Sequence, residues 1–345
     1  MSGGVDSSYA GYYLKNNGYD IEGVMFDMTL SDEQKYAQVY KDAYEVAEEL
    51  QIDFSVINMT ENFKKSVICP FISEYEKGRT PNPCVTCNKY VKIFELNRLR
   101  IEKGFEYMAT GHYARTEYDR TRGRYILKKG ADVSKDQSYV LYNLTQEELE
   151  HIIFPLGEMS KEDIRNNSQS AGLSVADKKD SQDICFIPDG DYAAFIESTT
   201  GRTYPEGDFV TTAGEVLGRH KGMIHYTIGQ RKGLGLSLPA PLYVVEKNIE
   251  KNCVILDNND ALFADTLYAE NINWIAFEKV EKPFCATAKT RYKQKEESCT
   301  IYPLENGSVK VVFDNPIRGI TQGQSVVFYD GDICLGGGII IGTEK

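Results

Sequence analysis

The sequence has no long apolar run and no excess of positive charge. No stretch approaches the roughly 20 apolar residues that span a bilayer, and no basic segment followed by an apolar one opens the chain as a signal peptide would. We therefore expect a cytoplasmic protein with no membrane partner. The formal net charge of −12 argues against a protein that binds polyanions through its overall charge, although nucleic acid needs only a local positive surface.

Cysteine is also scarce. Eight cysteines in 345 residues are too few for a disulfide scaffold, and only Cys84 and Cys87 are close together in the sequence. Cysteines in this setting are core residues, metal ligands or catalysts. Internal repeats and low-complexity tracts are absent, and the length predicts two or three domains.

The first 155 residues alternate between helical and strand patterns. Helices are predicted at 8–16 and 31–50, and short apolar strands at 21–26, 53–58 and 107–110. This alternation is typical of an α/β fold in which helices cover a parallel sheet.

The character of the chain changes after residue 155. A short helical stretch is followed by a turn-rich, β-rich segment from residue 203, and strand-like runs separated by glycines from about residue 260 predict a small β-barrel. We therefore predict three domains, at residues 1–155, 156–258 and 259–345.

The chain opens with Met1-Ser-Gly-Gly-Val-Asp-Ser-Ser8. Two glycines before a helix let backbone N–H groups and the positive helix end form an anion cradle, although an ordinary glycine-rich helix start is the alternative. The Gly-Lys-Ser/Thr ending of a P-loop is missing, so a γ-phosphate site is not expected. The run is similar to the PP-loop of enzymes that split ATP into AMP and pyrophosphate. A PP-loop normally follows an apolar strand, so we expect the first, central strand of the domain to be absent from this sequence.

Cys84 and Cys87 lie in the segment Arg79-Thr-Pro-Asn-Pro-Cys84-Val-Thr-Cys87-Asn-Lys89. A thiol at a helix start near Arg79, Lys89 and Lys92 should have a lowered pKa. Half of a zinc site, a redox dithiol and a nucleophile are the three interpretations of the pair. No second Cys-x-x-Cys exists and the four histidines show no ligand spacing, so a nucleophile is favoured and no metal site is predicted.

Cys185 sits in the apolar quartet Ile184-Cys-Phe-Ile187, directly after a very polar loop. From this context alone, a buried strand cysteine and a catalytic thiol both remain open.

Several motifs together resemble one family, the bacterial tRNA 2-thiouridylases. They are the segments 2–8, 80–88, 110–113, 135–138, 180–187, 228–233 and 335–338, in the same order as in that family. The resemblance covers the chain apart from the absent first strand. It implies an N-terminal PP-loop domain of the adenine nucleotide alpha hydrolase-like type, a small central domain that contacts tRNA, and a C-terminal β-barrel.

The resemblance also implies a reaction, the ATP-dependent 2-thiolation of the wobble uridine of tRNA. Cys185 would accept sulfur as a persulfide from a donor protein, and Cys87 would be the nucleophile that releases it or forms a Cys87–Cys185 disulfide. Cys84 occupies a position that varies in the family. Mg²⁺ would neutralise the pyrophosphate, and Asp6 would help to place the ion.

Individual binding residues follow from the resemblance. The residues expected to bind ATP are Met1, Ser2, Gly3, Gly4, Val5, Asp6, Ser7, Phe26 and Gly111. The residues expected to contact tRNA are Asn82, Pro83, Cys84, His112, Lys135, Asp136, Gln137, Arg291, Tyr292 and Gln324.

Two other functions remain as alternatives: a PP-loop sulfurtransferase that acts on another base, and a truncated tRNA-binding paralogue with impaired catalysis. Arg291 and Lys293 are two positions apart, so on a strand they would share one face and could contact phosphates together.

Overall fold

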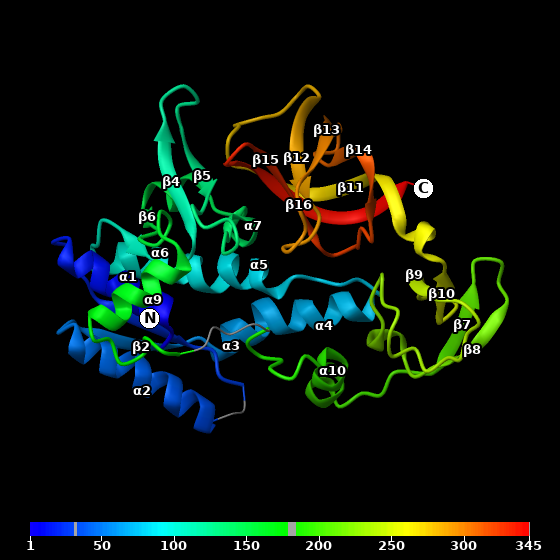
Figure 1. Ribbon diagram of the computed structural model, residues 1–345, viewed down its shortest axis with the longest axis horizontal. Coiled ribbons are helices and arrows are strands. Elements are labelled where there is room, and N and C mark those ends of the chain that lie inside the picture. The colour runs from blue at the N-terminus through cyan, green and yellow to red at the C-terminus, as the bar shows by residue number, and fades with distance from the viewer. Residues whose placement is uncertain (31–32, 179–183, 345) are drawn as a thin grey trace.

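The computed structural model describes residues 1–30, 33–178 and 184–344, which form three parts along the chain (Figure 1). An α/β part lies at one end, a small β-rich part at the other, and a β-barrel lies above the helices that run between them. This arrangement confirms the predicted fold class. In the described part of the chain, no helix is both long and apolar enough to cross a membrane.

The first part alternates helices and short strands. Its elements are α1 (Val5–Asn16), β1 (Gly23–Asp27), α2 (Glu33–Glu49), β2 (Phe54–Asn58), α3 (Thr60–Phe63), η1 (Lys64–Ile68), α4 (Cys69–Glu76), α5 (Pro83–Cys87), η2 (Asn88–Ile93), α6 (Phe94–Lys103), β3 (Met108–Ala109), β4 (Ala114–Asp119), β5 (Arg124–Lys129), α7 (Ser138–Leu141), α8 (Gln146–Glu150), β6 (Ile152–Ile153) and α9 (Lys161–Ser170).

The parallel strands form two separate pairs. β1 runs parallel to β2, and β3 runs parallel to β6. The three predicted strands are therefore confirmed as β1, β2 and β3. Within the residues described, no strand joins β1 to β3, so the parallel sheet is in two pieces.

Helix α1 is held by an apolar core of its own. Val5 and Tyr9 pack with Val46 of α2 and with Leu156 and Ile164, which lies in α9. This core fixes the start of α1, and with it the glycine-rich loop that precedes the helix.

Two long helical segments cross the middle of the molecule, and each contains a π-helical turn. The π-turn η1 lies between α3 and α4, and η2 lies between α5 and α6. The second segment begins at Asn82, whose side chain accepts a hydrogen bond from the Cys84 backbone N–H at 3.1 Å, with Pro83 in the first helical position. π-Turns of this kind occur frequently at functional sites.

The central part is a four-stranded sheet with one helix beside it. Its elements are α10 (Tyr192–Thr200), β7 (Gly207–Thr211), β8 (Val216–His220), η3 (Met223–His225), β9 (Tyr243–Asn248), β10 (Cys253–Asp257) and η4 (Asn259–Leu262). The strand order is β8-β7-β10-β9, around a core that includes Phe209, Tyr226 and Val254.

The C-terminal part is a closed barrel. Its strands are β11 (Phe263–Trp274), β12 (Phe284–Lys289), β13 (Glu297–Pro303), β14 (Val309–Arg318), β15 (Ser325–Asp330) and β16 (Ile333–Glu344). They follow the order β11-β14-β13-β12-β15-β16, and pairing of β11 with β16 closes the barrel.

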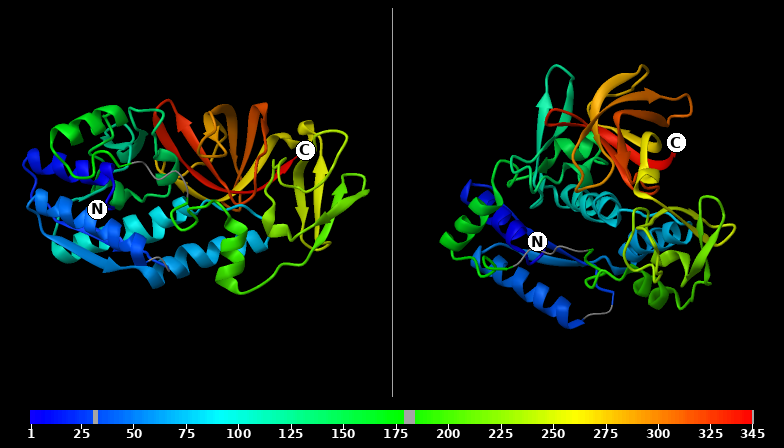
Figure 2. Two further views of the ribbon diagram at one scale, coloured as in Figure 1. Left: turned by 60° about the horizontal axis from the view of Figure 1, so that its bottom comes forward. Right: turned by 45° about the vertical axis from the view of Figure 1, so that its right-hand side comes forward.

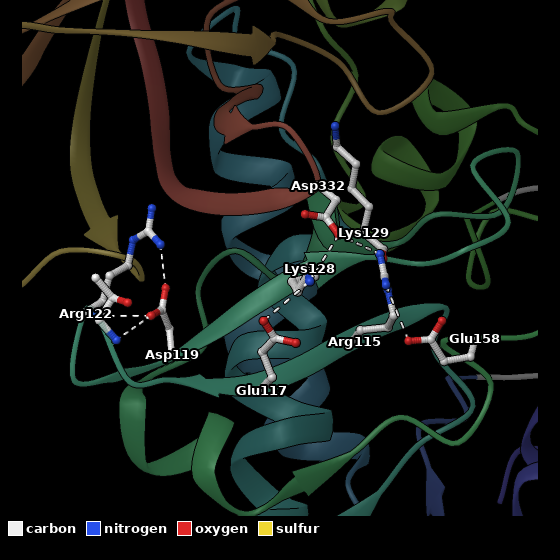
Figure 3. Close-up of polar contacts among 9 residues, drawn as sticks. Arg115, Glu117, Asp119, Arg122, Lys128, Lys129, Glu158 and Asp332 are labelled. Atoms are coloured by element: carbon white, nitrogen blue, oxygen red, sulfur yellow. Dashed lines mark hydrogen bonds and ion pairs between the residues drawn. The ribbon is translucent and has the colours of Figure 1, made fainter.

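The β4–β5 hairpin of the first part extends the barrel sheet. Lys128 lies opposite Ile333 and Leu127 lies opposite Cys334 in antiparallel register, and the hairpin stands beside the barrel in Figure 2. Asp332, in the turn before β16, receives ion pairs from Arg115 at 2.9 Å and from Lys128 at 3.3 Å (Figure 3). The barrel is therefore attached to the first part by strand pairing between β5 and β16 and by these ion pairs.

Candidate functional site

The glycine-rich loop is folded tightly against the start of α1. Gly3 adopts a left-handed backbone with φ of 62°, and a Cβ atom there would lie 2.6 Å from the Val39 carbonyl oxygen. The Ser2 and Ser7 hydroxyl oxygens are 2.9 Å apart, and the Ser7 hydroxyl donates to the Gly4 carbonyl oxygen at 3.2 Å. The loop thus leads into the N-terminal end of a 12-residue helix, where an anion is favoured.

Gly111 lies directly against this loop. A Cβ atom at Gly111 would be 2.8 Å from the Asp6 carbonyl carbon and 2.8 Å from the Ser7 backbone nitrogen. Only glycine fits at this distance. The structure therefore brings the predicted nucleotide residues on α1 and after β3 together.

Phe26 and Met25 project to opposite faces of β1 because successive strand residues alternate. Phe26 packs against the apolar cluster that contains Cys87. Met25, on the opposite face of the strand, is buried. Phe26 is therefore on the side of the sheet that faces the thiol.

Asp6 is paired with two residues that were not among the predicted site residues. Its Oδ1 accepts a hydrogen bond from the Tyr113 hydroxyl at 2.7 Å and from Lys161 Nζ at 2.7 Å. These bonds tie the first turn of α1 to α9, which leaves the second carboxylate oxygen as the one that could face an ion.

A second lysine also contacts the glycine-rich loop. Lys178 Nζ donates to the Gly3 carbonyl oxygen at 2.8 Å and forms an ion pair with Asp42. In the sequence this lysine could be described only as part of a basic pair. Its neighbour Lys179, like 180–183 of the predicted Cys185 motif, lies outside the described residues.

Cys84 and Cys87 lie on α5 in different surroundings. Cys84 is exposed, whereas Cys87 is 6% exposed and packs in a cluster with Val67 and Phe71. The predicted lowering of the Cys87 pKa is wrong. Burial raises the pKa of this thiol to about 11, and the charge of Lys92 opposes the rise only in part.

The prediction failed first because Cys87 is buried, and also because the other two expected cations are engaged elsewhere. Arg79 pairs with Glu74 at 3.4 Å, and Lys89 lies over the Tyr90 ring at 5.2 Å. Lys92 is the cation that acts on the thiol.

Cys185 is brought to the same place by its neighbours. Phe186 packs edge-on against Phe63 and Phe71, at 5.7 and 5.4 Å between ring centroids, and these rings belong to the cluster that contains Cys87. Cys185 itself is exposed, and its charge acts on both Cys84 and Cys87. The neighbour of Cys185 therefore packs against the cluster that contains Cys87, and both cysteines are free thiols.

His112 follows Gly111 at the edge of this group. Its Nδ1 is 2.9 Å from the Thr110 hydroxyl, and its ring lies edge-on to Phe154. Burial, together with the charge of Lys92, lowers the pKa of His112 to about 3, so its imidazole is neutral at physiological pH.

A loop of the barrel forms hydrogen bonds with the chain segment that precedes Cys84. The Thr80 N–H donates to the Gln322 carbonyl oxygen at 2.9 Å, and Gln324 Nε2 donates to the Thr80 carbonyl oxygen at 2.7 Å. Tyr292 lies in the barrel loop after β12. Burial raises the pKa of Tyr292 to about 12, and the charges of Asp136 and Cys84 add to the rise.

Arg291 and Lys293 are not on a strand, so the predicted shared strand face is wrong. Both lie in the loop between β12 and β13. The Arg291 side chain turns inward and donates to Thr321 Oγ1 at 2.8 Å and to the Gly319 carbonyl oxygen, whereas Lys293 is exposed.

Two further residues among those predicted to contact tRNA make internal hydrogen bonds. Asp136 is buried and accepts from the Ser138 backbone N–H at 3.0 Å, and Gln137 Oε1 accepts from the Tyr113 N–H at 3.0 Å. Lys135 precedes them in the same loop. No group of three or more His, Cys, Asp or Glu residues among those described is placed to hold a metal ion.

Three family models match successive segments of the chain. They are described as the tRNA methyl transferase HUP domain, over residues 1–189, the tRNA methyl transferase PRC-barrel domain, over 193–257, and the aminomethyltransferase beta-barrel domain, over 264–340.

Curated relatives match the chain along nearly its whole length. The tRNA-specific 2-thiouridylase MnmA 2 of Caldanaerobacter subterraneus subsp. tengcongensis is 51% identical over 349 residues, covering 99% of this chain and 96% of that protein. The tRNA-specific 2-thiouridylase MnmA of Acetivibrio thermocellus is 48% identical over 349 residues, covering 99% and 97%.

Among solved structures, the U34-tRNA thiolase NcsA from Methanococcus maripaludis is 19% identical, with a TM-score of 0.34 over 58% of this chain and 64% of that one. This likeness is too slight to carry an argument. The identity and coverage of the curated relatives are sufficient by themselves: the chain belongs to the family of tRNA-specific 2-thiouridylases.

Proposed function

We propose that the protein is a tRNA-uridine 2-sulfurtransferase, which uses ATP to replace the C2 oxygen of the wobble uridine with sulfur. One observation carries the proposal. Phe186, which follows Cys185, packs against the apolar cluster that contains Cys87, and Phe26 of β1, a predicted ATP-binding residue, packs against the same cluster. A predicted nucleotide-binding residue and the two cysteine segments therefore border one cluster.

Activation of the base comes first because a pyrimidine carbonyl oxygen is a poor leaving group. The uridine O2 attacks the α-phosphorus of ATP, pyrophosphate leaves, and the C2 oxygen carries AMP. The loop from Met1 to Ser7 fits this substrate because its backbone is closed against Gly111 at the N-terminal end of α1. Mg²⁺ would neutralise the pyrophosphate, and Asp6 could contribute only through its second oxygen, because Oδ1 is bonded to Tyr113 and Lys161.

Sulfur transfer follows. Cys185 carries a persulfide, Cys185–S–SH, loaded by a donor protein. The Cys87 thiolate attacks the Cys185 sulfur, which forms a Cys87–Cys185 disulfide and releases HS⁻. HS⁻ attacks C2, AMP leaves with the former carbonyl oxygen, and the S–H proton passes to water. A dithiol reductant supplies the two electrons that reopen the disulfide.

tRNA reaches the thiols between the first part and the barrel. Asn82, Pro83 and Cys84 lie at this entrance, next to the barrel loop that contains Gln324 and close to Tyr292. A tRNA-binding protein without catalysis is not favoured, because such a protein would not need both cysteine segments at one apolar cluster.

The test is thiolation of tRNA in vitro with ATP and a protein persulfide donor, followed by nucleoside mass spectrometry. We expect 2-thiouridine to appear only when ATP and the donor are both present. If the tRNA shows no 2-thiouridine, the proposal fails. If sulfur appears in a different nucleoside, the enzyme is a sulfurtransferase for another base.

A further inference from the structure

Asp6 brings a negative charge to the loop that is proposed to bind ATP. It is the second residue of α1, and the backbone N–H groups in the first turn of a helix have no partners within the helix. An anion bound to them would lie close to Asp6, because a carboxylate is within about 5 Å of the backbone nitrogen of its own residue. A carboxylate at this distance repels a polyanion such as pyrophosphate. The loop therefore needs a compensating charge.

Lys161 supplies this charge from α9. Its Nζ lies 2.7 Å from Asp6 Oδ1, which also accepts a hydrogen bond from the Tyr113 hydroxyl at 2.7 Å. The Lys161 side chain is 10% exposed, whereas the Asp6 side chain is 33% exposed. The ammonium is therefore enclosed by protein, and the carboxylate is the partly open member of the pair.

The position of Lys161 is fixed by the start of its helix. Ser160 and Asp163 form a capping box around the first turn of α9. Ile164 packs in the same apolar core as the first turn of α1. Because the helix start is capped and packed, the ammonium is held at Asp6 before any ligand binds.

A second ion pair at the loop follows the same arrangement. Lys178 donates to the Gly3 carbonyl oxygen and forms an ion pair with Asp42. The two lysines and the two aspartates of these pairs carry no net charge together. The loop can therefore offer its backbone N–H groups to an anion without a carboxylate that repels it.

We infer that Lys161 is a positioning residue of the nucleotide site: by fixing Asp6 and cancelling its charge, it allows the glycine-rich loop to accept the pyrophosphate group of ATP. The inference rests on the proposed function for the identity of the ligand. Its physical content is the charge at one place in the loop. That charge is zero in the wild type, negative without Lys161, positive when Asp6 is made neutral, and zero again when both are changed.

The experiment measures the affinity for inorganic pyrophosphate by calorimetric titration in EDTA at low ionic strength. No metal ion then takes part, and the charges are little screened. Lys161→Met should weaken binding by about threefold or more, because Asp6 is left with an unpaired charge. Asp6→Asn keeps an oxygen that can accept from Lys161 and Tyr113, and it should strengthen binding by about threefold or more. The double variant should lie within about twofold of the wild type.

Lys15→Met is the matched control. Lys15 lies in the last turn of the same helix and donates to the Leu50 carbonyl oxygen, so its removal takes away an equal charge at the end of α1 far from the loop. Its affinity should stay within about twofold of the wild type. Urea unfolding shows whether each variant is folded, and Lys161→Gln replaces Lys161→Met if the methionine variant unfolds.

Equal pyrophosphate affinity in the wild type and in the folded neutral variant of Lys161 would overturn the inference. A double variant as weak as Lys161→Met would also overturn it, because the contact would then act through structure rather than charge. Weaker binding by Asp6→Asn would do the same, since Asp6 would then attract the ligand. A wild type that binds no pyrophosphate refutes both the inference and the proposed ATP site. The expected order of affinities in a protein that thiolates no tRNA would uphold the inference and refute the proposed function.

Discussion

Cys87 and Cys185 differ in their access to water. Cys87 is 6% exposed in an apolar cluster, whereas Cys185 is exposed at the end of the segment that Phe186 anchors. An exposed thiol can receive sulfur from a second protein, and a buried one reacts with what is already inside the site. The two residues are therefore expected to have separable roles.

Serine variants of the three thiols test this division. Cys185→Ser should abolish persulfide loading from the donor and leave ATP binding intact, because the loop does not use the thiol. Cys87→Ser should accept the persulfide but fail to turn over, since no thiolate is left to release the sulfur. Cys84→Ser should be mild, because Cys84 contributes to the helix start only through its backbone N–H. Intact-protein mass spectrometry and thiolated-tRNA yield measure both steps.

Two outcomes would contradict the assignment. If Cys84→Ser is inactive while Cys87→Ser stays active, the wrong member of the pair has been named. If all three variants thiolate tRNA normally, the two-cysteine mechanism does not operate in this protein.

His112 should make the protein less stable in acid. Burial lowers its pKa from 6.5 to about 3 in the folded state, so between these values the unfolded chain binds a proton that the folded chain does not. The stability from the neutral imidazole is present above pH 6.5 and is lost as the pH falls toward 3. At pH 5 the loss is about 1–2 kcal/mol. Urea unfolding of wild type and His112→Asn at pH 7.5 and 5.0 measures it. An equal loss in both proteins would mean that His112 titrates normally when folded.

At the scale of elements, the contact between the β3 end and the first turn of α1 closes the nucleotide loop. Gly111→Ala would put a Cβ atom 2.8 Å from the Asp6 carbonyl carbon and the Ser7 nitrogen, so one backbone must move. We expect ATP affinity to fall by more than tenfold and the free energy of unfolding by about 1–3 kcal/mol. Gly342→Ala in β16, which has no atom within 4 Å of its Cβ position, is the matched control. Calorimetric ATP titration that shows equal affinity for both variants would rule out this role of the contact.

Secondary-structure elements can be predicted from the sequence where a short run of residues carries the pattern. The strands β1 and β2 are short apolar runs between helices with clear starts, and both are where the pattern places them. The π-turn η2 has no pattern of its own in the sequence, because its side chains are spaced along the chain much as those of an α-helix are. The boundary predicted after residue 155 falls just before Leu156, whose side chain packs with Val5 of α1. A contact between residues so far apart in the sequence cannot be predicted from local composition.

At the scale of the whole molecule, the site is assembled from segments far apart in the sequence. Resemblance to a family could pair Cys87 with Cys185, but residue patterns alone left Cys185 open as a buried strand cysteine. The raised pKa of Cys87 could not be predicted either, because nearby cations in the sequence do not reveal that Arg79 is paired with Glu74 or that the thiol is enclosed by Phe71. Charge effects depend on burial, and burial is a property of the assembled parts.

The binding of tRNA to a molecule of net charge −12 must depend on local cations at the junction of its parts. Arg291 is occupied by the Gly319 carbonyl oxygen and Thr321, so its removal should destabilise the β12–β13 loop rather than cost a phosphate contact. Lys293, exposed in the same loop, has no such bond among the described residues and is the cation that should meet a phosphate.

We therefore expect Lys293→Gln to reduce the slope of log affinity against log salt by about 0.7–0.9, the value for one released counterion. Arg291→Gln should leave the slope unchanged while lowering the free energy of unfolding by about 1–3 kcal/mol, because the buried Thr321 hydroxyl loses its donor and the Gly319 carbonyl oxygen keeps only the one from Thr321. The measurement is tRNA affinity at several salt concentrations, beside urea unfolding of each variant. If Arg291→Gln alone reduces the slope, the Arg291 side chain leaves Gly319 when tRNA binds and contacts a phosphate directly. If neither variant changes the slope, the β12–β13 loop is a solvated surface and tRNA approaches the thiols along another face.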